Sequence, residues 1–158
     1  MKSQTCCFTG HRKIPESELK GLKAALSAAI EKKIDEGYLY FGAGGALGFD
    51  TLAAQTVIEL RKSHPDIKLI LVLPCENQAA WWQESDKRIY SDIIAQADKV
   101  TVLQKTYTPD CMHKRNRHLV DNSNACICYL TEPTGGTAYT VAYAKANGME
   151  ITNLAEQN

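Results

Sequence analysis

The sequence predicts one α/β domain over residues 1–158, with a doubly wound, mainly parallel sheet that carries helices on both faces. Apolar runs of strand length alternate with helical stripes from end to end, and this alternation implies right-handed crossovers between parallel strands. The run at 67–74, IKLILVLP, is apolar throughout, as expected for a strand covered on both faces. The chain is long enough for one core and too short for two comfortable ones.

The first quarter of the chain predicts two strands and the helix between them. Residues 5–9 read as the first strand and residues 38–42 as the second. The helix begins at Pro15, because proline and acidic residues suit a first helical turn, and Gly37 ends it. Its apolar stripe consists of Leu19, Leu22, Leu26, Ile30 and Ile34.

Two further helices flank the run at 67–74. One spans about 47–63 and ends before Pro65, because a residue that precedes proline disfavours helical geometry. The other spans about 78–97, and Trp82 begins its apolar stripe.

The last third of the chain continues the same alternation. Strands are predicted at 99–104, 125–130 and 149–154, and helices at about 112–123 and 136–147. The last helix ends at Gly148. The total is six strands and five helices.

Composition and charge restrict the partners. Eighteen basic and eighteen acidic residues cancel, which argues against long duplex DNA or an anionic membrane held by bulk charge but allows a local basic pocket. The sequence has no apolar run long enough to cross a bilayer and no hydrophobic signal core at its start, so we expect a cytoplasmic protein. Six cysteines without zinc-ribbon spacing predict reduced, buried thiols and no metal site.

Candidate ligand-binding residues concentrate where the strands end. Open parallel sheets bind ligands outside the carboxyl ends of their strands, near a switch in strand order. Glycines, basic residues and hydroxyls follow several of the predicted strands at that edge. They are Gly10, His11 and Arg12 after the first strand, Gly42, Gly44, Gly45, Gly48 and Asp50 after the second, Arg115 and Asn116 after the fourth, and Thr134, Gly135, Gly136 and Thr137 after the fifth.

Two of these loops, at 41–50 and 133–137, are rich in glycine and enter helices. Exposed amides at a helix N-terminus bind anions, and glycine lets a phosphate approach the backbone. The first loop resembles the G-x-G-x-x-G dinucleotide fingerprint but is out of register, because Leu47 stands where the third glycine should be. Each loop alone could be a tight turn, and Thr134 and Thr137 could simply cap a helix. Together they predict a bound phosphate.

Helical spacing places Arg115 and Asn116 on the apolar side of their helix and Arg117 away from it. An inward arginine needs an anionic partner, either a protein carboxylate or a ligand phosphate, and we expect the phosphate. Asp50 could cap its helix or bind a ribose hydroxyl.

Aromatic and basic residues near this edge have two interpretations each. Trp82 is expected in the core, whereas Trp81 is a candidate for stacking on a base. His11 and Arg12 could contact phosphate or hold the first loop in place.

Four segments together resemble the YpsA-like branch of the SLOG superfamily, which also includes DprA and the LOG phosphoribohydrolases. They are CCFTGHRK, GAGGALGFDTLAA, LPCENQAAWW and MHKRNRHLVDNSNACICYLTEPTGGTAYTVAYA. The resemblance implies a Rossmann-like fold and a nucleotide-like ligand on the glycine loops, with no certain cofactor. It implies no defined reaction, and relatives commonly self-associate, so a homo-oligomer is an expectation.

One departure from the LOG pattern bears on catalysis. Arg115 matches the arginine of the LOG M-H-x-R-K segment, but the catalytic glutamate position corresponds to Thr140. In an N-glycosidase a carboxylate stabilises the oxocarbenium-like centre and activates water, and a threonine does neither well. No catalytic residue is therefore assigned, unless Glu132, Glu76 or Asp50 takes over this role.

Three functions remain open on this sequence. The preferred one is a sensor or regulatory module that binds an ADP-ribose-like compound or a nucleoside phosphate. The alternatives are a phosphoribohydrolase acting on nucleoside monophosphates and DprA-like binding of single-stranded DNA, which the neutral charge disfavours.

Overall fold

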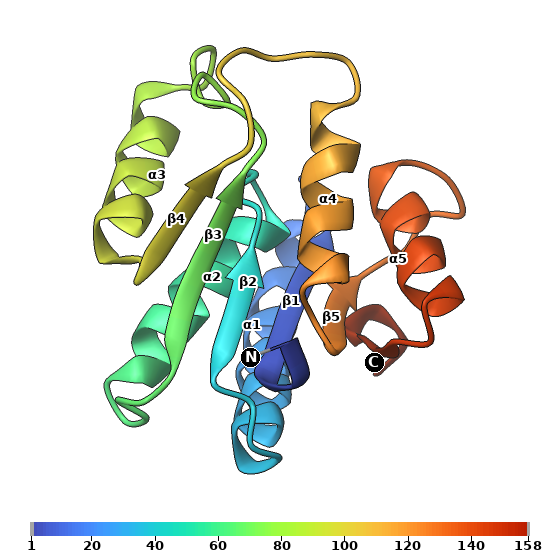
Figure 1. Ribbon diagram of the computed structural model, residues 1–158. Helices are drawn as coiled ribbons and strands as arrows, with labels where there is room; N and C mark the ends of the chain where they lie inside the picture. Colours follow the sequence, from blue (N-terminus) through green and yellow to red (C-terminus); the bar gives the residue numbers. More distant parts are fainter. Residues whose placement is uncertain (1, 158) are drawn as a thin grey trace.

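The computed structural model describes residues 2–157, and in that range the chain forms one six-stranded sheet in which all pairs are parallel (Figure 1). The strand order is β4-β3-β2-β1-β5-β6. This architecture confirms the predicted Rossmann-like α/β class. The strands are β1 (Thr5–Gly10), β2 (Tyr40–Ala43), β3 (Lys68–Leu73), β4 (Lys99–Val102), β5 (Ala125–Tyr129) and β6 (Glu150–Asn153).

Helices cover both faces of the sheet (Figure 1). The helices α1, α2 and α3 pack on one face, and α4 and α5 pack on the other. None of the helices described in residues 2–157 is long and apolar enough to span a bilayer. Their bounds are α1 (Glu16–Asp35), α2 (Phe49–Arg61), α3 (Glu84–Gln96), α4 (Cys111–Asp121) and α5 (Gly136–Ala146), with short 3-10 turns at Lys2–Gln4 and Leu154–Gln157.

The third helix begins later than the sequence predicts. Residues 77–82 form turns closed by short-range bonds, in which Ala80 N–H donates to the Asn77 carbonyl and Trp82 N–H to the Ala79 carbonyl, both at 3.1 Å. Helix α3 starts only at Glu84, so Trp82 precedes it and is half-buried. The prediction of a helix from 78 was wrong, because the apolar stripe extends into these turns.

The core has two parts, one on each face of the sheet. Cys6 and Phe8 belong to the α1–α2 side, whereas Cys7 packs on the α4–α5 side with Cys126 and Cys128. Cys6 and Cys7 therefore point to opposite faces of the sheet, as adjacent residues of a strand do. All six cysteines are buried and none forms a disulfide, which confirms the expectation of buried thiols, and their reduced state stays a prediction.

Coverage of β3 is less complete than its apolar sequence predicts. On the α1–α2 side, Leu69, Leu71 and Leu73 are buried. On the other side Val72 is buried, but Ile70 is only half-buried and lines an open groove of about 390 Å³ beside α4. Of the described helices, only α4 and α5 pack on this face, and they leave part of β3 and β4 uncovered.

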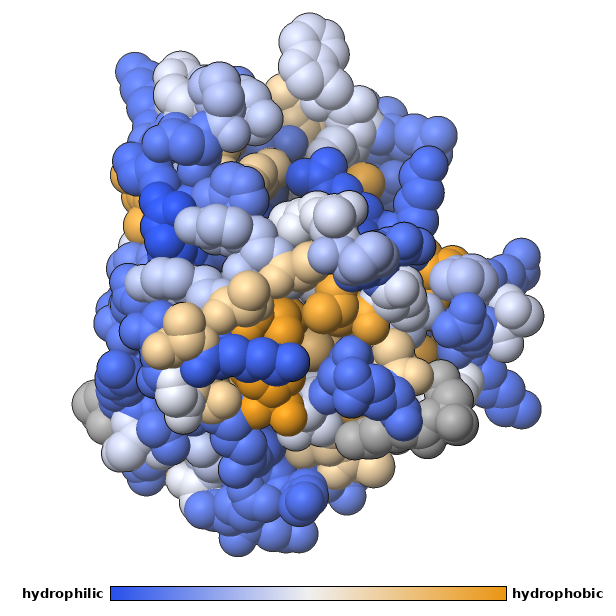
Figure 2. All heavy atoms as spheres, turned by 90° about the vertical axis from the view of Figure 1, so that its right-hand side faces the viewer, coloured by the Kyte–Doolittle hydropathy of each residue, from blue (hydrophilic) through white to orange (hydrophobic). Residues whose placement is uncertain are grey.

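The edge of the sheet at β6 carries apolar side chains as well. Leu130, Met149 and Ile151 are half-buried and pack against the second core. Figure 2 shows a patch of apolar residues on this side of the molecule, bordered by polar residues. β6 pairs only with β5 among the described strands.

Strand order reverses at the centre of the sheet. The chain runs outward from β1 to β4 on one side, then crosses to β5 and β6 on the other. The carboxyl ends of β1 and β5 therefore flank the switch point, where sheets of this kind bind ligands.

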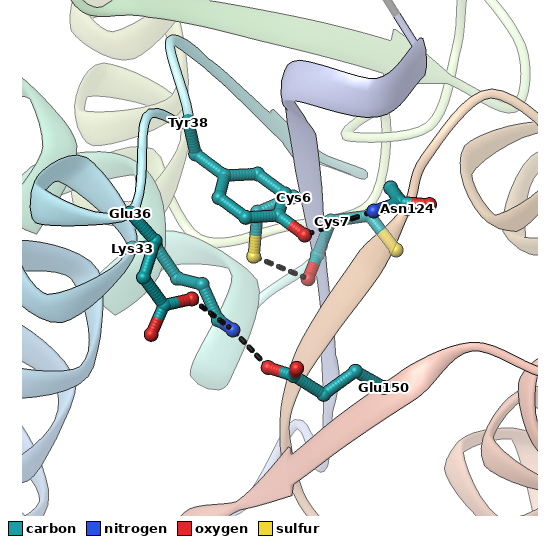
Figure 3. Close-up of polar contacts among 7 residues, drawn as sticks. All are labelled: Cys6, Cys7, Lys33, Glu36, Tyr38, Asn124 and Glu150. Atoms are coloured by element: carbon teal, nitrogen blue, oxygen red, sulfur yellow. Dashed lines mark hydrogen bonds and ion pairs between the residues drawn. The ribbon is translucent and has the colours of Figure 1, made fainter.

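A buried lysine joins the opposite, amino-terminal end of the sheet to α1 (Figure 3). Lys33 is 3% exposed, and its Nζ bonds to Glu36 Oε1 at 3.0 Å and also pairs with Glu150 of β6. The Tyr38 ring centroid lies 5.3 Å from Nζ, and the Tyr38 hydroxyl accepts a bond from Asn124 at 3.1 Å. Burial lowers the pKa of Lys33, but the bonds to both glutamates outweigh it, and the pKa is raised.

We expect Lys33→Ala to cost about 2–3 kcal/mol of unfolding free energy, because it removes the packed methylene stem as well as both ion pairs. Lys33→Met keeps the stem, and the glutamates are exposed enough to be solvated, so its cost should stay within about 1 kcal/mol. Urea denaturation at pH 7 measures both. Equal losses would show that the charge, not the packing, carries the stabilisation.

Candidate functional site

A cavity of about 260 Å³ opens at the switch point, and we refer to it as the switch-point cavity. Four segments that are distant in sequence meet around it: the end of β1 with the loop that follows, the loop before α2, one face of α4, and the N-terminus of α5. The lining residues are Thr9, Gly10, His11, Arg12, Ala46, Asp50, Met112, Arg115, Asn116, Gly136 and Thr137. Both glycine-rich loops therefore contribute to one cavity.

Arg115 is the most buried charge in the cavity wall, with 4% of its surface exposed. Its Nη1 donates to the Gly44 carbonyl and, at 3.4 Å, to Gln78 Oε1, and its Nε donates to Asn116 Oδ1 at 2.7 Å. No carboxylate among the described residues lies within 4.0 Å of it. Burial lowers the pKa of Arg115, and the negative charge of Asp50 opposes that shift.

Asp50 supplies the nearby negative charge. It is 6% exposed, and its Oδ2 accepts a bond from the Ala46 amide at 3.3 Å. Burial raises the pKa of Asp50, while the Arg115 guanidinium, the Ala46 amide and Arg12 partly offset the effect. The carboxylate thus stabilises its own loop and balances one of two arginines, and its contact with a ribose stays a prediction.

The glycines of the first loop are explained by close contacts within the protein. A Cβ on Gly44 would lie 2.5 Å from Arg115 Nη1, and one on Gly48 would lie 2.2 Å from the Arg12 carbonyl oxygen. Gly48 also has φ +78°, which other residues rarely adopt. A Cβ on Gly10 would lie 2.4 Å from Phe49, one on Gly45 2.7 Å from Leu73, and one on Gly42 a less severe 3.0 Å from Leu119. These glycines shape the cavity wall, and the loop reaches the cavity itself through Ala46 and Asp50.

The glycines of the second loop are open. Nothing lies within 4 Å of a Cβ built on Gly135 or Gly136, and Gly136 and Thr137 line the cavity. Helix α5 begins here without a side-chain cap, so the amides of its first turn are left for a ligand or solvent. Thr134 is exposed and lies outside the cavity wall.

Thr140, at the LOG glutamate position, does not reach the cavity. Its hydroxyl is buried and donates to the Gly136 carbonyl at 2.8 Å, one turn back in α5. This side chain is therefore occupied by its own helix.

His11 links the two central loops. Its Nε2 accepts a bond from Thr131 N–H at 2.9 Å, and its carbonyl accepts one from Phe49 N–H at 3.1 Å. The imidazole therefore acts as an acceptor that holds the loop after β1 against the loop after β5. Arg12 is exposed and lines the cavity, which leaves its guanidinium accessible to a ligand.

The remaining candidates divide by position. Arg117 lies outside the cavity and donates to the Tyr139 hydroxyl at 3.0 Å, as its helical spacing predicts. Trp81 is 95% exposed and lines no part of the cavity. Trp82 is half-buried with its ring centroid 5.0 Å from that of Tyr90.

Two contributors were missed by sequence reasoning. Met112 lines the cavity, with Sδ 3.6 Å from Arg115 Nη2, and Gln78 bridges Arg115 to the Tyr90 hydroxyl, which accepts from Gln78 Nε2 at 3.1 Å. Met112 and Arg115 are three residues apart, so helical spacing puts them on the same side of α4, and that was the available signal. Gln78 follows the third predicted strand at the same edge of the sheet, but nothing in the sequence shows that this turn is buried against Arg115.

The arrangement favours an anion. Two guanidinium groups, one carboxylate and the uncapped N-terminus of α5 give the cavity a net positive character. No group of three or more His, Cys, Asp or Glu side chains in the described range is placed to hold a metal ion.

Comparison with known proteins finds relatives in sequence. UPF0398 protein BH1768 of Halalkalibacterium halodurans is 32% identical over 127 residues, covering 78% of this chain and 67% of that protein. A UPF0398 protein of Bacillus thuringiensis is 30% identical over 135 residues, covering 84% and 73%.

Solved structures share the fold at low identity. DNA processing protein A (DprA) of Streptococcus pneumoniae superposes with a TM-score of 0.68 at 18% identity, and the match spans 95% of this chain but only 50% of that one. The single-stranded DNA-binding DprA of Helicobacter pylori also scores 0.68, at 15% identity over 99% and 71%. The family model of the YspA SLOG family matches residues 7–155, and the chain therefore belongs to the YspA SLOG family.

Proposed function

We propose that this protein is a sensor or regulatory module that binds a nucleotide or a nucleotide-derived phosphate in the switch-point cavity. One observation carries the proposal: the open N-terminus of α5 and the buried Arg115, which has no carboxylate partner among the described residues, line the same cavity. Membership of the SLOG family and the fold shared with DprA are compatible with it.

The residues divide into contacts and supports. The amides of Gly136 and Thr137 bind the phosphate, and Arg12 and Arg115 supply positive charge. We expect Asp50 and Asn116, which both line the cavity, to bind sugar hydroxyls. The wall is held in shape by Gly10, Gly42, Gly44, Gly45, Gly48 and His11. Thr134 and Gly135 directly precede the lining residue Gly136 and are not part of the wall.

A thermal-shift panel followed by calorimetry tests this proposal, with AMP, ADP-ribose, ribose 5-phosphate and inorganic phosphate as probes. Binding of a phosphate compound at 100 times its Kd should add about 2.7 kcal/mol of stability. Folded protein that none of these compounds stabilises would contradict the proposal.

Asp50 supports hydrolysis as a second candidate function. It is a buried carboxylate with a raised pKa that lines the cavity, whereas Glu76 and Glu132 are exposed and lie outside the wall. Perturbed carboxylates of this kind cluster at catalytic sites. Chromatography of AMP incubated with the protein would detect released adenine, and its absence across common nucleoside monophosphates would dismiss hydrolysis.

The exposed Trp81 keeps single-stranded DNA binding as an alternative, since bases stack on aromatic side chains. Gel shifts at two salt concentrations separate the two kinds of ligand, because DNA binding must weaken steeply with salt. The cytoplasmic location stays a prediction. Self-association does too, and the apolar side chains at the β6 edge support it.

A further inference from the structure

A second cavity of about 270 Å³ adjoins the switch-point cavity, and no role has been assigned to it. It lies between α2, the chain before and within α1, and the start of α3. Its wall is mainly apolar, with Leu47, Leu52 and Ile89 beside the aromatic rings of Trp82 and Tyr90. We call it the tryptophan cavity.

Arg12 connects the two cavities. Arg12 lines both cavities. Its backbone lies directly beside Gly48, the residue before α2, where a Cβ would lie 2.2 Å from the Arg12 carbonyl oxygen. A ligand whose phosphate lies at α5 can therefore extend past Arg12 into the tryptophan cavity. Each cavity alone is small, but together they reach the size typical of small-molecule sites, roughly 300–1,000 Å³.

The chemistry of the tryptophan cavity suits a flat ring with hydrogen-bond donors. Trp82 is half-buried and meets Tyr90 edge-on at 70°, so part of its ring stays open to a stacking partner. Besides Arg12 and the Tyr90 hydroxyl, the wall contains the polar side chains of Asp86 and Thr51. Thr51 already donates its hydrogen to the Ala46 carbonyl at 2.9 Å.

Asp86 has its acceptors unused. Its carboxylate makes no ion pair or side-chain hydrogen bond in the described part of the chain. Asp86 lies in the first turn of α3, where a negative charge interacts favourably with the helix dipole. That interaction does not explain why the carboxylate faces a cavity. An ionised carboxylate only accepts hydrogen bonds, so it favours a ring with an amino group and repels one with a carbonyl oxygen at the same position.

We propose that the tryptophan cavity binds the base of the nucleotide whose phosphate lies in the switch-point cavity, and that Asp86 selects a base with an exocyclic amino group. Trp82 stacks on that base, and Arg12 stands between base and phosphate. This inference rests on the proposed function and adds a substrate class to it: an amino-bearing nucleoside phosphate such as AMP.

Calorimetry with AMP, IMP and ribose 5-phosphate tests it. The wild-type protein should bind AMP at least tenfold more tightly than IMP or ribose 5-phosphate. Trp82→Ala should weaken the binding of AMP about tenfold and leave the affinity for ribose 5-phosphate unchanged, because the variant loses only the stacking contact with the base. Asp86→Asn should reduce the preference for AMP over IMP to less than threefold.

Fluorescence gives an independent readout, because the chain has only two tryptophans. Trp81→Phe leaves Trp82 as the sole fluorophore, and Trp82→Phe leaves Trp81. AMP should quench the fluorescence of Trp81→Phe and leave that of Trp82→Phe unchanged. The reverse pattern would place the base on Trp81 and overturn the inference.

The outcomes separate the two proposals. If ribose 5-phosphate binds and depends on Gly136, but Trp82→Ala and Asp86→Asn leave the ratios of AMP to IMP and to ribose 5-phosphate unchanged, the base site is refuted and the phosphate site stands. If no phosphate compound binds, both proposals fail.

Discussion

Gly136→Asp is expected to weaken AMP binding at least 100-fold, or about 2.8 kcal/mol, while the protein stays folded. The substitution puts a carboxylate where the phosphate should lie, beside the first amides of α5. The fold should tolerate it, because a Cβ at this position meets nothing within 4 Å and Gly136 does not need a positive φ. Calorimetry measures the affinity, and urea denaturation checks the fold.

Gly136→Ala is the matched control for this variant. It adds the same Cβ without the charge, so its AMP affinity should stay within about fivefold of wild type, about 1 kcal/mol. If Gly136→Asp binds AMP as well as Gly136→Ala does, the phosphate does not lie at the N-terminus of α5.

Arg115→Ala should lower both stability and affinity. It leaves the Gly44 carbonyl without its buried donor and removes the positive charge that offsets the buried Asp50, and this should cost about 3 kcal/mol of unfolding free energy. A lost charge-assisted contact with the phosphate should cost about a further 1.5–3 kcal/mol of AMP binding. Urea denaturation and calorimetry at a temperature where the variant is folded measure the two effects separately.

Arg117→Ala is the control for the charge of α4. Arg117 sits on the same helix but bonds to the Tyr139 hydroxyl outside the cavity, so both quantities should change by less than about 0.5 kcal/mol. Unchanged AMP affinity in folded Arg115→Ala would restrict Arg115 to holding the Gly44 loop.

Local sequence patterns were sufficient for the fold. Strand-length apolar runs and the 3.6-residue stripes depend on which face of each element is buried, and that information is present in a short window. The clear error concerned α3, where the stripe beginning at Trp82 lies partly in turns that precede the helix at Glu84. The burial of Ile70 was also overestimated, because an apolar run cannot show how much of the sheet the helices on that face cover.

The site was only partly predictable, because its contacts join distant parts of the chain. The first loop needs its glycines largely for Arg115, which lies 71 residues beyond Gly44, and for the Arg12 backbone. A glycine-rich stretch looks the same whether a ligand or the protein fills the space. The second loop has the open backbone that a phosphate site requires, and only the structure distinguishes the two loops.

The most direct measurement is a crystal structure of the protein grown with AMP. We expect a phosphate within hydrogen-bond distance of the Gly136 and Thr137 amides, with Arg12 or Arg115 in contact with it. A ligand bound elsewhere, or a cavity closed by the protein's own side chains at saturating AMP, would contradict this expectation.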